Sequence, residues 1–361
     1  MSAPAWGHRA PAPSAPAAAA PPGRRSGLRP LTLLLCMGLL AGLLLTLGVC
    51  VGSTGLSPLS ALWTDPLAAQ IVLDIRLPRT LGALAAGALL GLAGAVAQGL
   101  FRNPLADPYL LGSASGASLG VATALVLFGL KPAAMLLSPD WLMRLGLTGA
   151  AFVGAVLAVA LTLLLARGVQ QTLRLLLAGV IVGVVLGAVT SLLLLRVPDI
   201  MQPMQAFMLG NTGFVGWTSA ALMGTVWAAC AVAALAASRV LDGLSLGEAT
   251  ALSLGLPLGA LRVLLVGVLA LATGTAVAQT GLIAFVGLAA PHLVRGLVKT
   301  GHAWQLLLAS LAGGCLLLVA DVLARWCTAP QELPVGVLTA VLGGSYLLWL
   351  MHRRGGLGGR P

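Results

Sequence analysis

The chain has 361 residues, of which 59% are hydrophobic and 8% are charged, and its net charge at pH 7 is +11. Soluble proteins average about a quarter charged residues, so this composition excludes an ordinary soluble protein. The basic residues stand singly between apolar runs, which excludes the continuous basic face that a nucleic acid would need. Apolar runs of about 18 residues or more recur along the whole chain, and each is long enough to cross the hydrocarbon core of a membrane.

We therefore predict an all-α integral membrane protein, a polytopic bundle of about ten transmembrane helices. Residues 1–30 are rich in alanine and proline and cannot form a core, so we expect a disordered cytoplasmic tail there. Residues 31–351 are predicted to form one transmembrane domain, and residues 352–361 a second cytoplasmic tail. In chain order the predicted spans are 31–52, 80–101, 109–130, 146–166, 174–196, 218–238, 262–280, 282–298, 305–324 and 334–351.

The positive charges divide unevenly between the two sides that these spans define. Of the 20 lysines and arginines, 14 fall on the side of the N-terminus and 6 on the other side. In membrane proteins the cytoplasmic loops carry the excess of positive charge, so both termini are predicted to be cytoplasmic.

A polar turn broken by two prolines follows the second span, with the sequence Arg102-Asn103-Pro104-Leu105-Ala106-Asp107-Pro108. Two prolines and an asparagine do not continue a helix comfortably, so the chain is expected to leave the membrane and turn back here. We expect Arg102 and Asp107 to hold this turn. Glycines at four-residue spacing, such as Gly112 and Gly116, are expected to let neighbouring helices approach closely.

The segment between the sixth and seventh spans, residues 239–261, carries signals for a short helix. Ser245 and Glu248 fit a capping box at its start, and Gly255 with Pro257 would end it. Such a helix either folds against the membrane surface or docks a cytosolic partner. The composition of this segment supports the two interpretations equally.

The sequence offers no polar constellation of the kind that an enzyme needs. The four histidines lack metal-ligand spacing and no G-x-x-x-x-G-K-[ST] motif occurs, so we expect no metal or cofactor on this chain, and any ATP on another. Asp321 is the one acid well inside an apolar run, as a proton-coupled carrier would require. Arg325 lies four residues later, so an ion pair on one helix face is the favoured interpretation, and a membrane scaffold is a further alternative.

Several ordered stretches resemble the FecCD/BtuC family, the membrane subunits of type II ATP-binding-cassette importers for iron-siderophores, haem and vitamin B12. The resemblance covers nearly everything from about residue 60 to residue 351. The matching stretches are Arg76–Arg79, Arg102–Pro108, Leu111–Gly112, Ser115–Ala117, Leu246–Glu248, Ser253–Gly255, Gly287–Leu288, Pro291–Arg295 and Glu332–Ala340.

The resemblance implies an importer built from several chains. It implies a homodimer with the substrate path at its interface, two cytosolic ATPase subunits that bind ATP and Mg²⁺, and a periplasmic substrate-binding protein. The chain would then be a multi-pass protein of the bacterial inner membrane, in contact with lipid, with no nucleic-acid partner and no reaction of its own. The implied substrate is an iron(III)-siderophore or related metal chelate, with cobalamin or haem as alternatives.

The resemblance also implies roles for individual residues. Coupling to the ATPase falls on Ser245, Leu246, Gly247, Glu248, Ala249, Leu254 and Gly255. Docking of the binding protein falls on Arg76, Arg79 and Arg325. A gate or structural role falls on Arg102, Asn103, Pro104, Asp107, Pro108, Gly112, Gly116, Pro291, His292, Pro334 and Gly336.

Overall fold

The computed structural model describes residues 28–52, 55–56, 65–128, 141–166 and 172–355, and each of the ten predicted spans overlaps a helix in this part of the chain. Seven of the described helical stretches are long and apolar enough to cross a membrane, and α5 and α16 contain shorter apolar stretches. The ten helices are α1 (Pro30–Cys50), α4 (Leu77–Leu100), α5 (Ser113–Phe128), α7 (Trp141–Leu165), α8 (Thr172–Arg196), α10 (Trp217–Ala236), α13 (Leu258–Thr280), α14 (Val286–Leu297), α15 (His302–Trp326) and α16 (Val335–Gly355).

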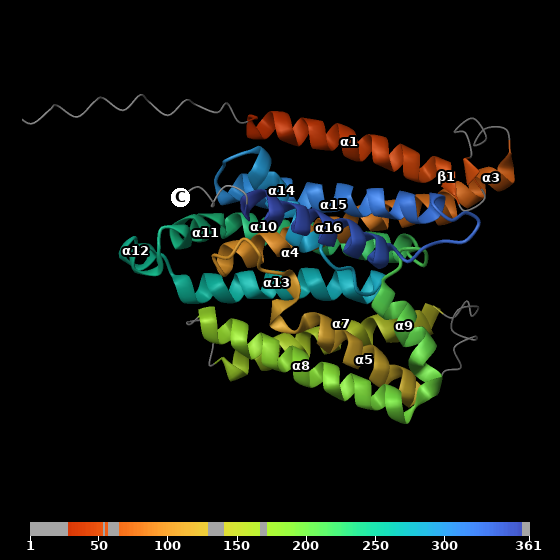
Figure 1. Cartoon of the computed structure of the whole chain (residues 1–361), viewed down its shortest axis with the longest axis horizontal. Coiled ribbons are helices and arrows are strands. Elements are labelled where there is room, and N and C mark those ends of the chain that lie inside the picture. Colours follow the sequence, from red (N-terminus) through yellow and green to blue (C-terminus); the bar gives the residue numbers. More distant parts are fainter. Residues whose placement is uncertain (1–27, 53–54, 57–64, 129–140, 167–171, 356–361) are drawn as a thin grey trace, which may run out of the picture.

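Shorter elements connect these helices at the two ends of the bundle (Figure 1). One end, here called the α9 end, carries β1 (Val51–Gly52), β2 (Gly55–Leu56), α3 (Pro66–Ile71), η1 (Val72–Arg76), η3 (Pro198–Ile200) and α9 (Met201–Leu209). The opposite end, here called the α12 end, carries α11 (Ser238–Ser245) and α12 (Glu248–Ser253). A 3-10 turn, η2 (Pro108–Leu111), precedes α5. Both the start of α1 and the end of α16 lie toward the α12 end (Figure 1).

The second span begins well before residue 80, where it was predicted to start. Helix α3, the π-helical η1 and α4 form one continuous helical stretch from Pro66 to Leu100. Asp65 caps this stretch by accepting a hydrogen bond from the amide of Leu67 at 2.9 Å. Pro66 lies in the first turn of this stretch, where a missing N–H leaves no hydrogen bond unmade. Pro78 lies inside the stretch, directly after the π-helical η1, and the carbonyl oxygen of Leu73 in η1 accepts a hydrogen bond from the Trp217 ring at 3.0 Å.

The seventh and eighth spans are separated by residues 281–285, which are not helical. Gly281 has a φ of +70° and Phe285 a φ of +68°, a left-handed conformation that non-glycine residues rarely adopt. Helix α14 has 12 residues, so it rises about 18 Å, roughly half of the hydrocarbon thickness. The predicted helix over 282–298 is therefore corrected, because residues 282–285 are not helical.

The predicted C-terminal boundary of the transmembrane domain stays a prediction, because a helix can continue beyond the membrane surface. Helix α16 continues to Gly355, past the predicted end of the transmembrane domain at residue 351. The rest of the predicted C-terminal tail, and nearly all of the N-terminal tail over 1–30, lie outside the described residues.

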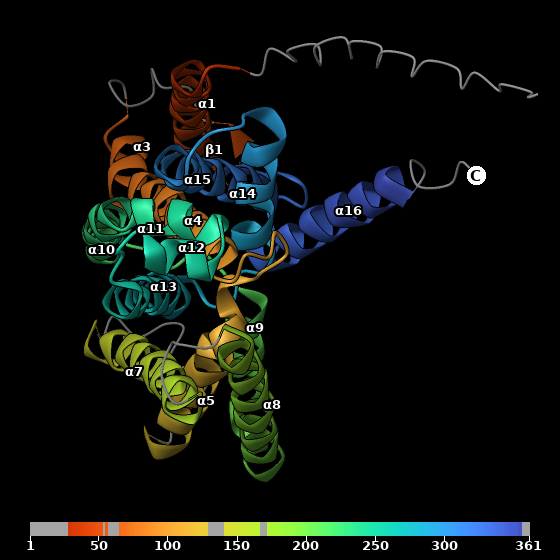
Figure 2. The same cartoon turned by 90° about the vertical axis from the view of Figure 1, so that its left-hand side faces the viewer.

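The core is organised around α4, which packs against α10, α13, α14 and α15 (Figure 2). Helices α4 and α15 approach backbone to backbone. A Cβ atom at Gly87 would lie 2.3 Å from the carbonyl oxygen of Gly313, and one at Gly91 would lie 2.2 Å from that of Ala309. The four-residue glycine spacing on α4 therefore serves close helix packing, as predicted.

Helices α5, α7 and α8 form a second group beside this core (Figure 2). Helices α5 and α7 cross at Gly116 and Gly154, where a Cβ at Gly116 would lie 2.3 Å from the carbonyl oxygen of Gly154. Helix α8 packs closely against η2, the turn before α5. A Cβ at Gly179 would lie 2.0 Å from the carbonyl oxygen of Leu110. Nothing lies within 4 Å of the same position at Gly187, so α8 diverges from α5 along its length.

Candidate functional site

The loop between α10 and α13 forms two short helices, α11 and α12, that project at the α12 end (Figure 1). The capping box predicted from Ser245 and Glu248 is not formed. Ser245 is the last residue of α11, and its hydroxyl donates to the carbonyl oxygen of Asp242 at 2.6 Å. The capping position of α12 is taken by Gly247, whose φ of +111° favours glycine and whose amide still closes the last turn of α11.

Helix α12 is followed by Gly255, as predicted. Gly255 has a φ of +74°, and its amide donates to the carbonyl oxygen of Leu252 at 2.9 Å, which is the usual glycine cap at a helix C-terminus. Three leucines of this loop are exposed to solvent or membrane, with Leu246 at 67%. Clustered exposed apolar side chains outside the bundle are typical of a protein-interaction surface. These leucines are Leu246, Leu252 and Leu254.

Glu248 ties α12 to the beginning of α13. Its Oε1 accepts a hydrogen bond from Nη1 of Arg262 at 2.8 Å, and the Arg262 side chain is buried whereas that of Glu248 is 40% exposed. The hydrogen bond from Arg262 lowers the pKa of Glu248, and the charge of Arg102 acts in the same direction. The loop between α10 and α13, here called the docking loop after the role that the family resemblance predicts, therefore lies beside the polar turn that follows α4.

The polar turn after α4 is held by its own backbone and side chains. Arg102 adopts a left-handed φ of +48° and follows the last turn of α4, a position that glycine usually takes. The side-chain oxygen of Asn103 accepts from the amide of Leu105 at 3.0 Å, and that of Asp107 from the amide of Tyr109 at 2.8 Å. The segment is thus a turn, as expected, with Asp107 contributing its side chain and Arg102 its backbone.

This turn is attached to α14 by contacts that its own sequence did not indicate. Arg295 of α14 donates to the side-chain oxygen of Gln98 on α4 and, at 3.5 Å, to the carbonyl oxygen of Pro104 in the turn. Gln98 in turn donates to the carbonyl oxygen of Leu288 at 3.2 Å. A polar residue inside the apolar run of α4 was the available signal in the sequence.

The other residues of the predicted gate group are spread through the bundle. Gly112, with a φ of +82°, links η2 to α5. Pro291 and His292 are buried within α14, and the His292 ring lies edge-on to a tyrosine ring of α16 with the centroids 6.1 Å apart. Pro334 precedes α16, and a Cβ at Gly336 would lie 2.2 Å from a carbonyl oxygen of α9. They therefore serve several separate helix contacts.

At the α9 end, a buried charge network is centred on Asp321 of α15. Its side chain is 0% exposed and pairs with Arg325, one turn later, as predicted. The Nε of Arg79 on α4 donates to Oδ1 of Asp321 at 3.0 Å, and the hydroxyl of Thr212 donates to the same oxygen at 2.5 Å. Both carboxylate oxygens therefore have donors, as a charge removed from water requires.

The same network holds α1 and the segment before α16 at this end. Nη1 of Arg325 donates to the carbonyl oxygens of Gly48 at 2.7 Å and Val51 at 3.0 Å. Nη1 of Arg79 donates to a carboxylate oxygen of Glu332 at 2.8 Å. Some of these partners are 277 residues apart in the chain. Sequence spacing could therefore indicate the pair four residues apart and none of the others.

Arg76, Arg79 and Arg325, the predicted docking residues, all lie at the α9 end and are buried. Arg76 donates to the carbonyl oxygens of Val49 at 3.3 Å and Cys50 at 3.2 Å, which places its guanidinium against the end of α1. The structure thus brings the three arginines to one end of the bundle with partners inside this chain. Their docking of a binding protein stays a prediction.

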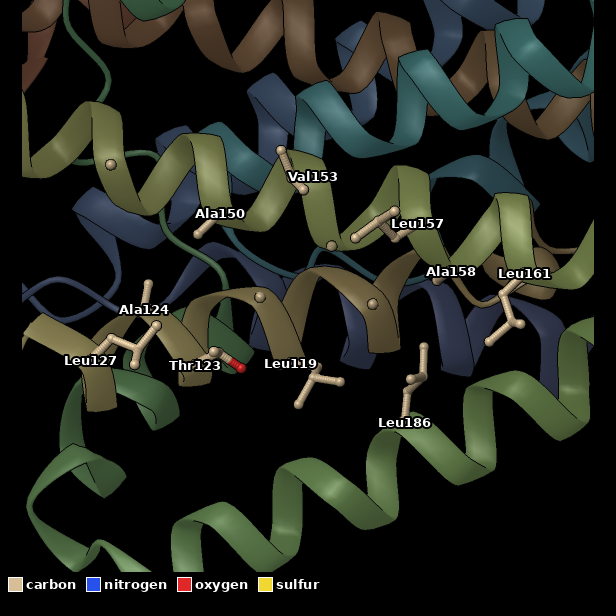
Figure 3. A pocket seen from close by; sticks show the side chains of 14 residues that line it. Leu119, Thr123, Ala124, Leu127, Ala150, Val153, Leu157, Ala158, Leu161 and Leu186 are labelled. Carbon is tan, nitrogen blue, oxygen red and sulfur yellow. The ribbon is translucent and has the colours of Figure 1, made fainter.

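A separate apolar groove of about 540 Å³ runs between α5, α7 and α8 (Figure 3). Leu119, Leu157 and Leu186 border it from the three helices, and Thr123 supplies the one polar side chain among the lining residues. This lining offers no group for catalysis. Within the described ranges, no group of three His, Cys, Asp or Glu side chains could hold a metal ion.

Comparison with known proteins gives concordant results from sequence and structure. Residues 39–353 match the model of the FecCD transport family. The chain is 39% identical over 328 residues to the vitamin B12 import system permease protein BtuC of Escherichia coli O17:K52:H18 (strain UMN026 / ExPEC), covering 89% of this chain and 95% of the relative. The BtuC protein of Escherichia coli O139:H28 (strain E24377A / ETEC) matches with the same identity and coverage.

Two solved structures resemble the chain. An inward-facing structure described as a metal-chelate type ABC transporter is 29% identical, with a TM-score of 0.79 and coverage of 90% of this chain and 99% of its own. PsaBC from Streptococcus pneumoniae, in complex with Fab, is 18% identical with a TM-score of 0.53, covering 80% of this chain and 92% of its own. The second match bears on the fold alone.

Proposed function

Because the chain belongs to the FecCD transport family, we propose that its importer carries a large metal chelate across the inner membrane. The chain is the membrane-spanning permease subunit of an ATP-binding-cassette importer. The 39% identity with vitamin B12 import permeases over most of both chains makes cobalamin the first candidate substrate. An iron(III)-siderophore, the expectation from the sequence, is the second, supported by the 29% identity with a metal-chelate type transporter.

Uptake of radiolabelled cobalamin, iron(III)-siderophore and haem into vesicles that contain the complete importer tests this proposal. We expect ATP-dependent accumulation of cobalamin, with unlabelled cobalamin as the effective competitor. Uptake of an iron(III)-siderophore or haem in its place would keep the metal-chelate class and displace cobalamin. Uptake of none of the three would overturn the proposal.

The importer is proposed to contain two copies of this chain, two cytosolic ATPase subunits that bind ATP and Mg²⁺, and a periplasmic substrate-binding protein. Both termini of the chain are proposed to be cytoplasmic. The 14 to 6 division of positive charges supports this orientation. The start of α1 and the end of α16 lie toward one end of the bundle, which supports termini on a shared side (Figure 1).

The ATPase is proposed to dock at the α12 end, on the coupling residues Ser245–Ala249 and Leu254–Gly255. The exposed leucines of this loop support that assignment. The binding protein is proposed to dock at the opposite end, at Arg76, Arg79 and Arg325. Arg79 and Arg325 pair with two carboxylates there, whereas Arg76 donates to the backbone carbonyl oxygens of Val49 and Cys50 and makes no salt bridge within the described residues. The charge of Arg76 therefore supports an acidic partner surface.

A proton-coupled secondary carrier is the rival of a different class. Such a carrier needs a carboxylate that can gain and lose a proton on the transport path. Asp321 already accepts hydrogen bonds from Arg79, Arg325 and Thr212, which disfavours that role. Uptake driven by a proton gradient in vesicles that lack the ATPase would favour the carrier.

A further inference from the structure

Asp242 of α11 and His302 of α15 make a second polar contact at the α12 end, and no role discussed above includes them. Oδ1 of Asp242 accepts a hydrogen bond from the backbone amide of His302 at 3.0 Å. The same oxygen lies 2.7 Å from Nδ1 of the His302 ring. One carboxylate thus holds both the backbone and the side chain of the first residue of α15.

This contact supplies the cap that α15 does not have in its own sequence. The N-cap residue of α15 is Gly301, which has no side chain to accept a hydrogen bond. The first amides of a helix need acceptors, and the helix dipole favours a negative charge there. Asp242 provides both from another helix, so the start of α15 is fixed to α11.

The charge of Asp242 is maintained by this partner. Burial acts to raise the pKa of Asp242, but the hydrogen bonds and charge of His302 outweigh it, and the net pKa is lowered. The carboxylate is therefore ionised at neutral pH, the form that serves a helix N-terminus best.

Helix α11 is seated on the core through several residues, whereas α12 buries Ala251 alone. Val240, Leu241 and Leu244 of α11 are buried. At Gly99, near the end of α4, a Cβ would lie 3.1 Å from the Leu241 side chain and 3.3 Å from the His302 ring, so α11, α4 and α15 meet at one point. A displacement of the docking loop can therefore reach that point through α11.

Helix α15 connects this point with the opposite end of the bundle. It has 25 residues and therefore rises about 38 Å. Its far end carries Asp321 and Arg325, the centre of the buried charge network. Between the two ends it packs backbone to backbone on α4 through Gly313 and Ala309.

We propose that the Asp242–His302 contact is the link through which movement of the docking loop reaches α15, and through α15 the buried network at the α9 end. The two side chains are positioning residues for transport, since they act through helix α15. This inference rests on the proposed docking of the ATPase at the α12 end.

The test measures uptake and ATP hydrolysis in the same proteoliposomes, which contain the complete importer, with labelled cobalamin and iron(III)-siderophore as the probes. In Asp242→Ala and in His302→Ala, uptake per ATP hydrolysed should fall about fivefold or more, while the ATPase still co-purifies. Asp242→Asn keeps an acceptor oxygen and should restore most of this ratio. Lys299→Gln, at an exposed charge three residues before His302, is the matched control and should leave the ratio unchanged.

The possible outcomes distinguish a failure of the proposed Asp242–His302 link from a failure of the proposed importer function. An unchanged ratio in a folded Asp242→Ala importer would overturn the link and leave the proposed function intact. Failure of the wild-type chain to bind an ATPase would overturn the proposed function itself. Where Asp242→Ala does not fold, His302→Ala decides, because it keeps the backbone cap and removes the ring contact alone. An unchanged ratio in that variant would again overturn the link.

Discussion

The two ends of the bundle use the same kinds of side chain in opposite settings. At the α9 end, Asp321 is fully buried and shared by several donors. At the α12 end, the side chains of Glu248 and Asp242 are 40% and 50% exposed, and each has one basic side-chain partner. A buried charge that loses its partner cannot turn to water, whereas an exposed one can. The carboxylate at the α9 end is therefore held by burial, whereas the two carboxylates at the α12 end stay accessible to water.

Removal of the Asp321 carboxylate should have the largest effect, and it is the most direct test of the difference between the two ends. In Asp321→Asn the guanidinium groups of Arg79 and Arg325 stay buried without their shared counter-charge. The free energy of unfolding, measured by SDS titration in mixed micelles, should fall by about 3–5 kcal/mol. A loss under about 1 kcal/mol would place Asp321 with the exposed pairs and contradict the comparison.

A change of donor geometry at the same end should have an intermediate effect. Arg79 serves Asp321 and Glu332 with two different nitrogens, and a lysine ammonium is a point charge that cannot reproduce this fork. Arg79→Lys should therefore lower the free energy of unfolding by about 1.5–3 kcal/mol. Arg102→Lys, at an exposed arginine, is the matched control and should change it by less than about 0.5 kcal/mol. Equal losses of unfolding free energy in the two variants would show that burial of the arginine does not determine the size of the effect.

The smallest effect is expected at the α12 end. At neutral pH, Glu248→Gln should lower the free energy of unfolding by less than about 1 kcal/mol, because Glu248 is partly exposed to water and glutamine keeps an acceptor oxygen for the buried Arg262. The pKa of Glu248 lies below its ordinary value of 4.5 in the folded protein, chiefly because of the hydrogen bond from Arg262. Its stabilisation is therefore fully present above the unfolded pKa and is lost as the pH falls through the folded pKa.

Unfolding measured over a pH series would sharpen that prediction. The difference in stability between wild type and Glu248→Gln should shrink toward zero at pH values below the folded pKa of Glu248. A difference that grew on acidification would reverse the sign of the linkage and contradict the lowered pKa.

The sequence could predict the approximate positions of the long apolar helices, because long apolar runs indicate membrane crossing directly. It could not predict the irregular segments inside those runs. Nothing in the composition of residues 281–285 shows that Phe285 adopts a left-handed conformation and that α14 starts late. The capping box at Ser245 failed for a related reason, since a local motif competes with the last turn of the helix before it.

The candidate site also contains some contacts that the sequence could predict and others that it could not. The pair of Asp321 and Arg325 could be predicted because its spacing follows the helix repeat. The contacts of Arg79 with Asp321 and Glu332 join residues that meet only when the bundle closes, so one sequence without relatives cannot reveal them. The coupling residues were found through family resemblance, and the exposure of their leucines became visible only in the structure.

The long separation of the buried partners also affects how the protein is made. Arg79 leaves the ribosome 242 residues before Asp321, an interval of roughly 12–50 s at about 5–20 residues per second. During that interval the arginine has no acidic partner from α15, and a lone charge in hydrocarbon is costly. The newly inserted first half must therefore keep this side chain near the water interface until α15 arrives. Closure of the bundle is a late event of biosynthesis, set by the last helices of the chain.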